Sequence, residues 1–194
     1  EMEKVLEAIE RCGNIELIGL HFHIGSQITN LNAFKELCIR VNEIQEWFYD
    51  RQIIVDHVNV GGGLGVDYHE PDKHAVADFK TFFELFDQFL ELRPKQKLHF
   101  ELGRVIVAQC CSLIGKVLYI KNGLTTNFAI LDAGMTELIR PALYQAYHKI
   151  ENLTGKGPET KYDVVGPICE SGDQLGTDRL LPPTQEGDVL LIAT

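Results

Sequence analysis

Hydrophobic and polar positions follow a helical period through much of the first half of the chain. From Asn32 to Tyr49, apolar residues recur every three or four positions, which predicts an amphipathic helix. Ala77 to Leu92 repeats the pattern with phenylalanines on one face, and Arg93-Pro94 is expected to end it. Glu1 to Cys12 shows the same period and stops at Gly13, a favourable helix C-cap residue.

Short apolar runs separate these predicted helices. Ile15 to Phe22 is apolar enough to be a strand buried on both faces, as in a parallel sheet, and Val55 to Val60 is a second strand. A third strand ends in the stretch Leu98 to Arg104. Strands alternating with helices indicate βα units, and polar residues at the strand ends are typical of an α/β barrel. A doubly wound open sheet is the alternative, weakened by the lack of a complete dinucleotide fingerprint.

The pattern changes after Arg104. Val105 to Lys121 and Asn127 to Leu131 are β-branched, apolar runs joined through the turn dipeptide Asn122-Gly123, which favours a β domain. Tyr162 to Ile168 predicts another strand. Between them, Arg140 to Ile150 is expected to form a short helix with Pro141 in its first turn.

These patterns predict two domains. Residues 1–104 are expected to be the C-terminal βα units of a (β/α)₈ barrel, and residues 105–194 a β domain that is incomplete at its end. Three strands cannot close a barrel, so the earlier strands would lie upstream of Glu1. Glu1 opens directly into a helix and Val189 to Thr194 stops inside a strand pattern, so we expect a piece of a longer protein.

Composition narrows the classes of function. The 18 basic and 28 acidic side chains give a net charge of −10, which argues against a nucleic-acid-binding surface. The five cysteines form no C-x-x-C pair, which fits a reducing compartment and a cytoplasmic protein. No apolar run reaches the roughly 20 residues of a membrane span, so no membrane partner is expected.

Three stretches at predicted strand ends contain residues that could bind a ligand or take part in catalysis. His21 and His23 lie two apart on a strand and face the same side, but a metal site is disfavoured because no third ligand is evident. An imidazole could instead stack on an aromatic ring, with Ser26 binding a phosphate. Gly61 to Gly65 would let backbone N–H groups approach a phosphate, although a plain glycine turn remains open. Glu101 could balance a cationic ring nitrogen of the same cofactor.

A fourth candidate lies in the β domain. Cys169-Glu170 sits in a polar turn, where a thiol would be exposed enough to transfer a proton. The other four cysteines lie in apolar or helical patterns and are expected to be small core residues, namely Cys12, Cys38, Cys110 and Cys111.

Taken in order, six motifs resemble the diaminopimelate decarboxylase family of alanine-racemase-like pyridoxal 5'-phosphate (PLP) enzymes, which is related to ornithine and arginine decarboxylases. Each motif is weak alone, but together they cover nearly the whole chain from Leu17. They are His23-Ile24-Gly25-Ser26-Gln27, Gly61 to Gly65, Glu101-Leu102-Gly103-Arg104, Asp132-Ala133-Gly134-Met135, Arg140-Pro141-Ala142-Leu143-Tyr144 and Cys169-Glu170-Ser171-Gly172-Asp173.

The resemblance implies a PLP-binding (β/α)₈ barrel followed by a β domain, in a homodimer with active sites at the subunit interface. It implies decarboxylation of meso-2,6-diaminopimelate to L-lysine, the last step of lysine biosynthesis. By the family pattern, His23 stacks on the PLP ring, Ser26 and Gly63 bind its phosphate, and Glu101 pairs with its ring nitrogen. The remaining assignments place Leu102, Gly103 and Arg104 in the cofactor shell, Arg104, Arg140, Tyr144 and Glu170 at the substrate, and Cys169 as a proton donor supplied by the partner subunit.

The chain departs from the family pattern in three respects. The PLP-bearing lysine is expected upstream of Glu1, and an active-site tyrosine is expected just past Thr194. Leu102 replaces the usual proline of its motif. Three alternatives stay open: an ornithine- or arginine-type decarboxylase, a non-catalytic homologue, and a metal-dependent barrel hydrolase.

Overall fold

The structure is a computed structural model that describes residues 1–73 and 77–193. The described chain divides into two compact units. Unit 1 contains residues 1–65 and 77–105, and unit 2 contains residues 66–73 and 106–193. The segment 66–73, which follows the glycine run, therefore groups with the C-terminal part of the chain.

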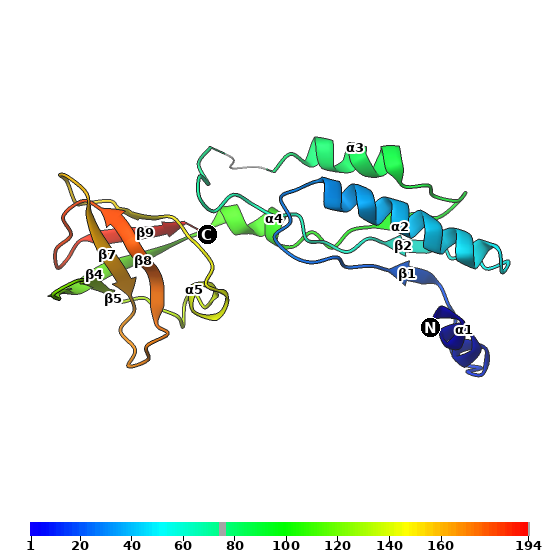
Figure 1. The fold of residues 1–194 in the computed structure, drawn as a ribbon, viewed down its shortest axis with the longest axis horizontal. Helices are drawn as coiled ribbons and strands as arrows, with labels where there is room; N and C mark the ends of the chain where they lie inside the picture. The colour runs from blue at the N-terminus through cyan, green and yellow to red at the C-terminus, as the bar shows by residue number, and fades with distance from the viewer. Residues whose placement is uncertain (74–76, 194) are drawn as a thin grey trace. The chain divides into compact units, whose positions relative to one another are not determined.

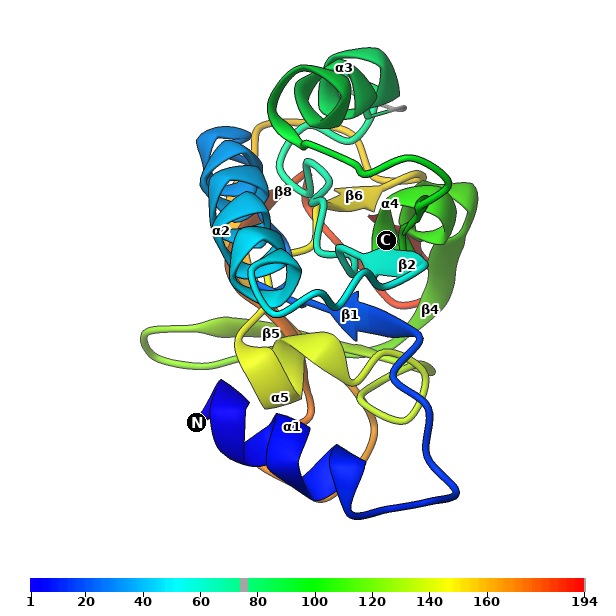
Figure 2. The same ribbon diagram turned by 90° about the vertical axis from the view of Figure 1, so that its right-hand side faces the viewer.

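Unit 1 is built on a three-stranded parallel sheet. Its strands are β1 (Gly19–His21), β2 (His57–Asn59) and β3 (Lys97–His99), in the order β1-β2-β3. The connections contain α2 (Asn32–Tyr49) and α3 (Phe79–Phe89), which lie side by side in Figures 1 and 2. The predicted βα alternation is confirmed, and α2 has the predicted bounds.

Aromatic side chains join the helices of unit 1 to its sheet. The rings of Phe34 and Phe82 meet edge to face with centroids 5.0 Å apart, and those of Phe86 and Phe100 do the same at 5.0 Å. Asp78 caps α3 by accepting a hydrogen bond from the Thr81 backbone N–H at 3.0 Å. The helix ends at Phe89, before the predicted Arg93-Pro94, because the backbone is already extended at Leu90.

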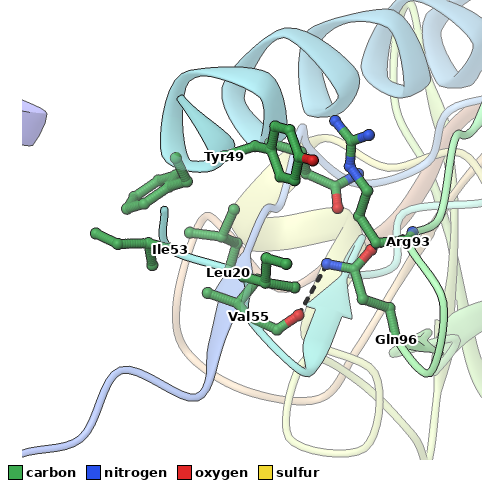
Figure 3. Close-up of a pocket in the computed structure, with 9 residues that line it drawn as sticks. Leu20, Tyr49, Ile53, Val55, Arg93 and Gln96 are labelled. Atoms are coloured by element: carbon green, nitrogen blue, oxygen red, sulfur yellow. Dashed lines mark hydrogen bonds between the residues drawn. The ribbon is translucent and has the colours of Figure 1, made fainter. Parts of the chain in front are cut away.

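A small hollow under α2 shows how tightly this unit is packed. Figure 3 shows the side chains that line it, where Gln96 donates a hydrogen bond to the Val55 carbonyl oxygen at 2.8 Å. Its volume is about 10 Å³, which is at most the space of one water molecule. This hollow is a packing feature and not a ligand site.

Two predictions for the N-terminal region are wrong. The first helix, α1 (Met2–Glu10), is capped by Arg11 in right-handed geometry, so Gly13 is not its C-cap. Ile15 and Ile18 are 59% and 57% exposed, so the predicted burial of this stretch on both faces does not hold. The reason is that both residues lie outside the regular strand, which begins only at Gly19.

Unit 2 is a mixed six-stranded sheet. Its order is β6-β9-β4-β5-β7-β8, with β5 and β7 parallel and the other neighbours antiparallel. The edge strands β6 and β8 also contact each other, so the sheet curls towards a barrel. The strands are β4 (Ser112–Asn122), β5 (Asn127–Leu131), β6 (Ile150–Asn152), β7 (Thr160–Val165), β8 (Gln174–Leu181) and β9 (Val189–Ala193).

The core of unit 2 lies on the inner face of this sheet. It includes Leu131, Val164, Leu175 and Leu190, each at most 1% exposed. The Asn122-Gly123 turn joins β4 to β5 as predicted, with the Gly123 N–H donating to the Thr126 carbonyl at 3.0 Å.

The predicted strand from Val105 to Lys121 is wrong in its first part. Residues 104–107 form α4 (Arg104–Val107), a single 3₁₀ turn follows, and β4 begins only at Ser112. Val105 is buried, whereas Ile106 and Val107 are 63% and 58% exposed, a helical and not an alternating pattern. The helix α5 (Arg140–Tyr144) has Pro141 in its first turn as predicted, but it ends early because Gln145 is left-handed.

Residues 1–73 and 77–193 include no helix of the length and apolar character needed to cross a membrane.

The packing of α2 generates a stability prediction. Leu37 is 4% exposed and Ile39, on the same helix, is 47% exposed. Replacing Leu37 with alanine should lower the free energy of unfolding by about 2–5 kcal/mol, because it leaves a cavity at the buried face of α2. Ile39→Ala is the matched control and should cost under about 1 kcal/mol, since alanine also favours the helix. Urea unfolding of both variants measures the difference, and equal losses would contradict this packing.

Candidate active site

The carboxyl ends of the three parallel strands of unit 1 bring polar side chains together around Glu101. The Asn59 side-chain amide donates to Oε1 of Glu101 at 2.9 Å, and Nε2 of His21 lies 3.3 Å from Oε2. His21 and Asn59 are register partners at the ends of β1 and β2, and Asn59 pairs in turn with His99 of β3. The sheet register therefore places both groups against the same carboxylate.

These contacts set the ionisation of Glu101. The hydrogen bond from Asn59 lowers the pKa of the Glu101 carboxyl below its ordinary value, and His21 adds to the effect. The Asn59 amide is itself oriented, because its oxygen accepts a hydrogen bond from the Gly61 N–H at 2.8 Å. Glu101 is therefore a fixed anion at neutral pH, suited to a cationic partner.

The glycine run has a steric role at this site. A Cβ atom at Gly62 would lie 2.1 Å from the Glu101 carbonyl oxygen. Gly63 has a φ of +105°, and a Cβ there would lie 2.3 Å from the Gly25 carbonyl oxygen. Only glycine permits this close approach of three chain segments, so the run is required by packing between loops. Its predicted contact with a phosphate remains a prediction.

Other predicted cofactor residues surround the same point. Nδ1 of His23 lies 3.4 Å from the Gly62 backbone nitrogen, and Arg104 donates to the Ser26 hydroxyl oxygen at 3.0 Å. The structure therefore gathers five predicted residues at these strand ends, namely His23, Ser26, Gly63, Glu101 and Arg104. Leu102 and Gly103 lie between two of them in sequence, and a Cβ at Gly103 would meet nothing within 4 Å.

Unit 2 contains three of the four predicted substrate residues, Arg140, Tyr144 and Glu170, whereas Arg104 belongs to unit 1. Arg140 and Tyr144 are one helical turn apart on α5, which places them on the same side of it. The Arg140 guanidinium donates from Nη1 to Nε2 of His148 at 2.7 Å, and its Cζ lies 4.5 Å from the ring centroid of Tyr68. Tyr144 is 70% exposed.

Cys169 and Glu170 lie in an exposed turn after β7, and Asp173 anchors that turn. The Asp173 carboxylate, 2% exposed, accepts hydrogen bonds from the Ile168 N–H at 2.9 Å and the Met135 N–H at 2.6 Å. Asp173 thus fixes the backbone beside Cys169 while the thiol remains exposed.

Sequence reasoning missed several residues of these two sites. Asn59, Tyr68, His148 and Asp173 all contact predicted site residues or fix their backbone. One feature of the sequence could have indicated a role for Asn59 in the site: it lies at a strand end, two residues before the glycine run. For the pair His21 and His23 the sequence left open a metal site, ring stacking, or one histidine that packs while the other forms a hydrogen bond; His21 contacts the Glu101 carboxylate, in agreement with the last of these.

Comparison with known proteins assigns the family. Residues 28–194 match the family model described as "Pyridoxal-dependent decarboxylase, C-terminal sheet domain". The chain belongs to this family. The resemblance and fold class predicted from the sequence are confirmed, and the family description agrees with the predicted cofactor.

Individual members of the pyridoxal-dependent decarboxylase family are similar along the whole chain. A diaminopimelate decarboxylase of Bacteroides thetaiotaomicron is 55% identical over 192 residues, covering 99% of this chain and 50% of that protein. The crystal structure of diaminopimelate decarboxylase from M. jannaschii with L-lysine superimposes with a TM-score of 0.78 at 34% identity, covering 97% of this chain and 45% of that one.

A lysine/ornithine decarboxylase from Vibrio vulnificus with cadaverine superimposes with a TM-score of 0.84 at 25% identity, covering 98% of this chain and 52% of that one. The chain thus spans about half the length of the curated relatives it matches.

The contacts of Glu101 generate a titration prediction. Asn59→Ala should raise the pKa of Glu101 towards its ordinary value, because the hydrogen bond that stabilises the anion is lost. Glu101 should then stay protonated to a higher pH, as followed by its carboxyl-carbon NMR shift. Asn42→Ala is the matched control, since Asn42 bonds to Phe89 and Glu91 on the α3 side. An unchanged titration in Asn59→Ala would contradict the assignment.

Proposed function

We propose that the protein containing this chain is a PLP-dependent carboxy-lyase that converts meso-2,6-diaminopimelate to L-lysine. The observation that carries the proposal is the ionised Glu101 held by Asn59 and His21 beside the glycine run. It occurs in a chain that is 55% identical to a diaminopimelate decarboxylase over 192 residues. A strand end that serves only folding does not require a carboxylate held by two polar side chains.

The residues at the strand ends of unit 1 fit PLP. A pyridine nitrogen attracts protons more weakly than most protein bases, and an anionic Glu101 favours its charged form. Arg104 and the hydroxyl of Ser26, 3.0 Å apart, supply donors for a phosphate, and His23 supplies a flat ring. When bound, PLP supplies an electron sink for the electron pair that a departing carboxylate leaves behind.

The residues of unit 2 fit the substrate. Arg140 offers a planar fork for the carboxylate at the end of the substrate that is not cleaved. Tyr144 lies on the same side of α5, and Glu170 can accept from the ammonium group at that end. Diaminopimelate has both groups at its far end, whereas ornithine has only the amine.

Cys169 is the proposed proton donor. After loss of carbon dioxide, the carbon atom must gain a proton, and an exposed, positioned thiol suits that transfer. The proposal includes a homodimer in which Cys169 serves the active site of the partner subunit. It also includes a cytoplasmic location, which the five free thiols support.

An ornithine- or lysine-type decarboxylase is the second candidate. The similarity to the Vibrio vulnificus lysine/ornithine decarboxylase favours it, but at 25% identity against 55%. The two candidates differ in the need for a partner to the distal carboxylate, so Arg140 decides between them.

The role of Cys169 is tested in the full-length protein. Cys169→Ala should lower kcat by about 10²- to 10⁴-fold, the usual loss for a missing general acid, while PLP absorbance stays unchanged. Cys12→Ala is the matched control: this thiol follows α1 and is also exposed, as are Cys110 and Cys111, so the expectation of a core position holds only for Cys38. Cys12→Ala should keep full activity. Wild-type turnover in Cys169→Ala would refute the role.

The same variant tests the shared active site. Mixing Cys169→Ala with inactive Glu101→Ala should restore activity, because a heterodimer contains one site with neither substitution. No recovery after verified subunit exchange would show that each subunit uses its own thiol.

The substrate is tested at Arg140. Arg140→Leu should lower kcat/KM for diaminopimelate by about 30- to 5,000-fold, the usual loss when a buried charge loses its partner. Activity on ornithine should change much less, so the preference for diaminopimelate narrows. Equal losses on both substrates, or a wild-type preference for ornithine, would favour the second candidate.

A further inference from the structure

His148 is a buried histidine whose two ring nitrogens face opposite kinds of partner. The side chain is 1% exposed. Nδ1 lies 2.8 Å from the Ala193 carbonyl oxygen, which can only accept, so Nδ1 must have the proton. Nε2 lies 2.7 Å from Nη1 of Arg140, which can only donate, so Nε2 must be the acceptor. Both contacts are satisfied together only by the neutral ring with its proton on Nδ1.

The anchor of this chain of contacts is the sheet of unit 2. Ala193 ends β9 and pairs with Ser112 of β4, and its own N–H donates to the Lys149 carbonyl at 2.9 Å. The carbonyl that holds His148 is therefore fixed by the framework of the sheet. Because His148 is bonded to this carbonyl and also accepts from Arg140, it holds the guanidinium in place relative to the sheet.

Tyr68 constrains the same guanidinium from another direction. Its ring centroid lies 4.5 Å from Cζ of Arg140 and 4.9 Å from the centroid of the His148 ring, at an interplanar angle of 64° to the latter. Arg140 donates a hydrogen bond to His148, and its guanidinium also lies over the ring of Tyr68. Together these two contacts restrict the position of an otherwise flexible side chain.

We propose that His148 is a positioning residue for substrate recognition, which orients Arg140 towards the distal carboxylate of the substrate. This rests on the proposed function of Arg140. A guanidinium has five N–H donors, so the bond to His148 is compatible with a two-bond pair to a carboxylate. Ordering Arg140 before the substrate arrives removes part of the entropic cost of binding.

The neutrality of His148 is central to this role. An aspartate or glutamate would also hold Arg140, but it would cancel the positive charge and compete with the substrate carboxylate. A neutral acceptor holds the guanidinium and leaves its charge to the substrate. His148 therefore contributes to substrate specificity in two ways: it orients Arg140, and it leaves the positive charge of Arg140 available to the substrate carboxylate.

Substituting His148 with glutamine or asparagine in the full-length enzyme tests its two hydrogen bonds separately. In His148→Gln the amide oxygen reaches the place of Nε2 and retains the acceptor for Arg140. In His148→Asn the shorter amide reaches only the place of Nδ1 and retains the contact to Ala193. The asparagine variant should raise KM for diaminopimelate by about 10- to 150-fold with kcat nearly unchanged, whereas glutamine should stay within about threefold. Equal KM values in both variants would refute the proposal.

A third variant keeps the test decisive if asparagine impairs folding. His148→Glu has the shape of the glutamine variant and adds only a negative charge. It should raise KM for diaminopimelate well above that of His148→Gln, with little effect on ornithine. Equal values for Glu and Gln would overturn the argument from neutrality.

A double variant distinguishes failure of the positioning role of His148 from failure of the proposed function of Arg140. In Arg140→Leu, adding His148→Asn should change KM no further, because its effect acts through Arg140. If Arg140→Leu behaves as proposed and His148→Asn alone leaves KM at the wild-type value, only the positioning role fails. If Arg140→Leu leaves the preference between the two substrates unchanged, the proposed function fails first.

Discussion

The close backbone approach at the carboxyl ends of β1, β2 and β3 is the constraint on which the site of unit 1 depends. Because side chains are excluded at Gly62 and Gly63, the segments that follow the three strands come within contact of one another. Parallel pairing then brings His21, Asn59 and Glu101 to the same level of the sheet. A methyl group at either glycine would separate these segments and with them the groups that hold the carboxylate.

The two units treat charge in the same way. In unit 1 an anion, Glu101, is held chiefly by the neutral amide of Asn59. In unit 2 a cation, Arg140, is held by the neutral imidazole of His148 and the ring of Tyr68. In each case the main hydrogen-bond partner orients the ionised group without neutralising it. A ligand of opposite charge then meets an oriented, charged group, which is the arrangement that favours strong polar recognition.

The sequence predicted those parts of the structure that depend on local patterns. The period of α2 defined its bounds, because its buried residues recur strictly on one face, and the Asn-Gly turn defined the start of β5. Val105 to Cys110 was mistaken for a strand because its β-branched composition hides a helical burial pattern. The strand β8 was missed, and so was His148, whose contact with Ala193 spans 45 positions. Contacts of that range leave no local periodicity to read.

The segment 66–73 has a consequence for work with fragments of this family. It contributes Tyr68 to Arg140 and Asp72 to Lys149, and the ring of His69 stacks on Tyr147 at 4.1 Å. A sheet domain cut out of the gene at residue 106 would lack all three partners, even though its own strands were intact. Its Arg140 would then lose the aromatic ring over which its guanidinium lies. An excised sheet domain that is to keep these contacts, or a chimera between two decarboxylases, must therefore include residues 66–73 together with the sheet.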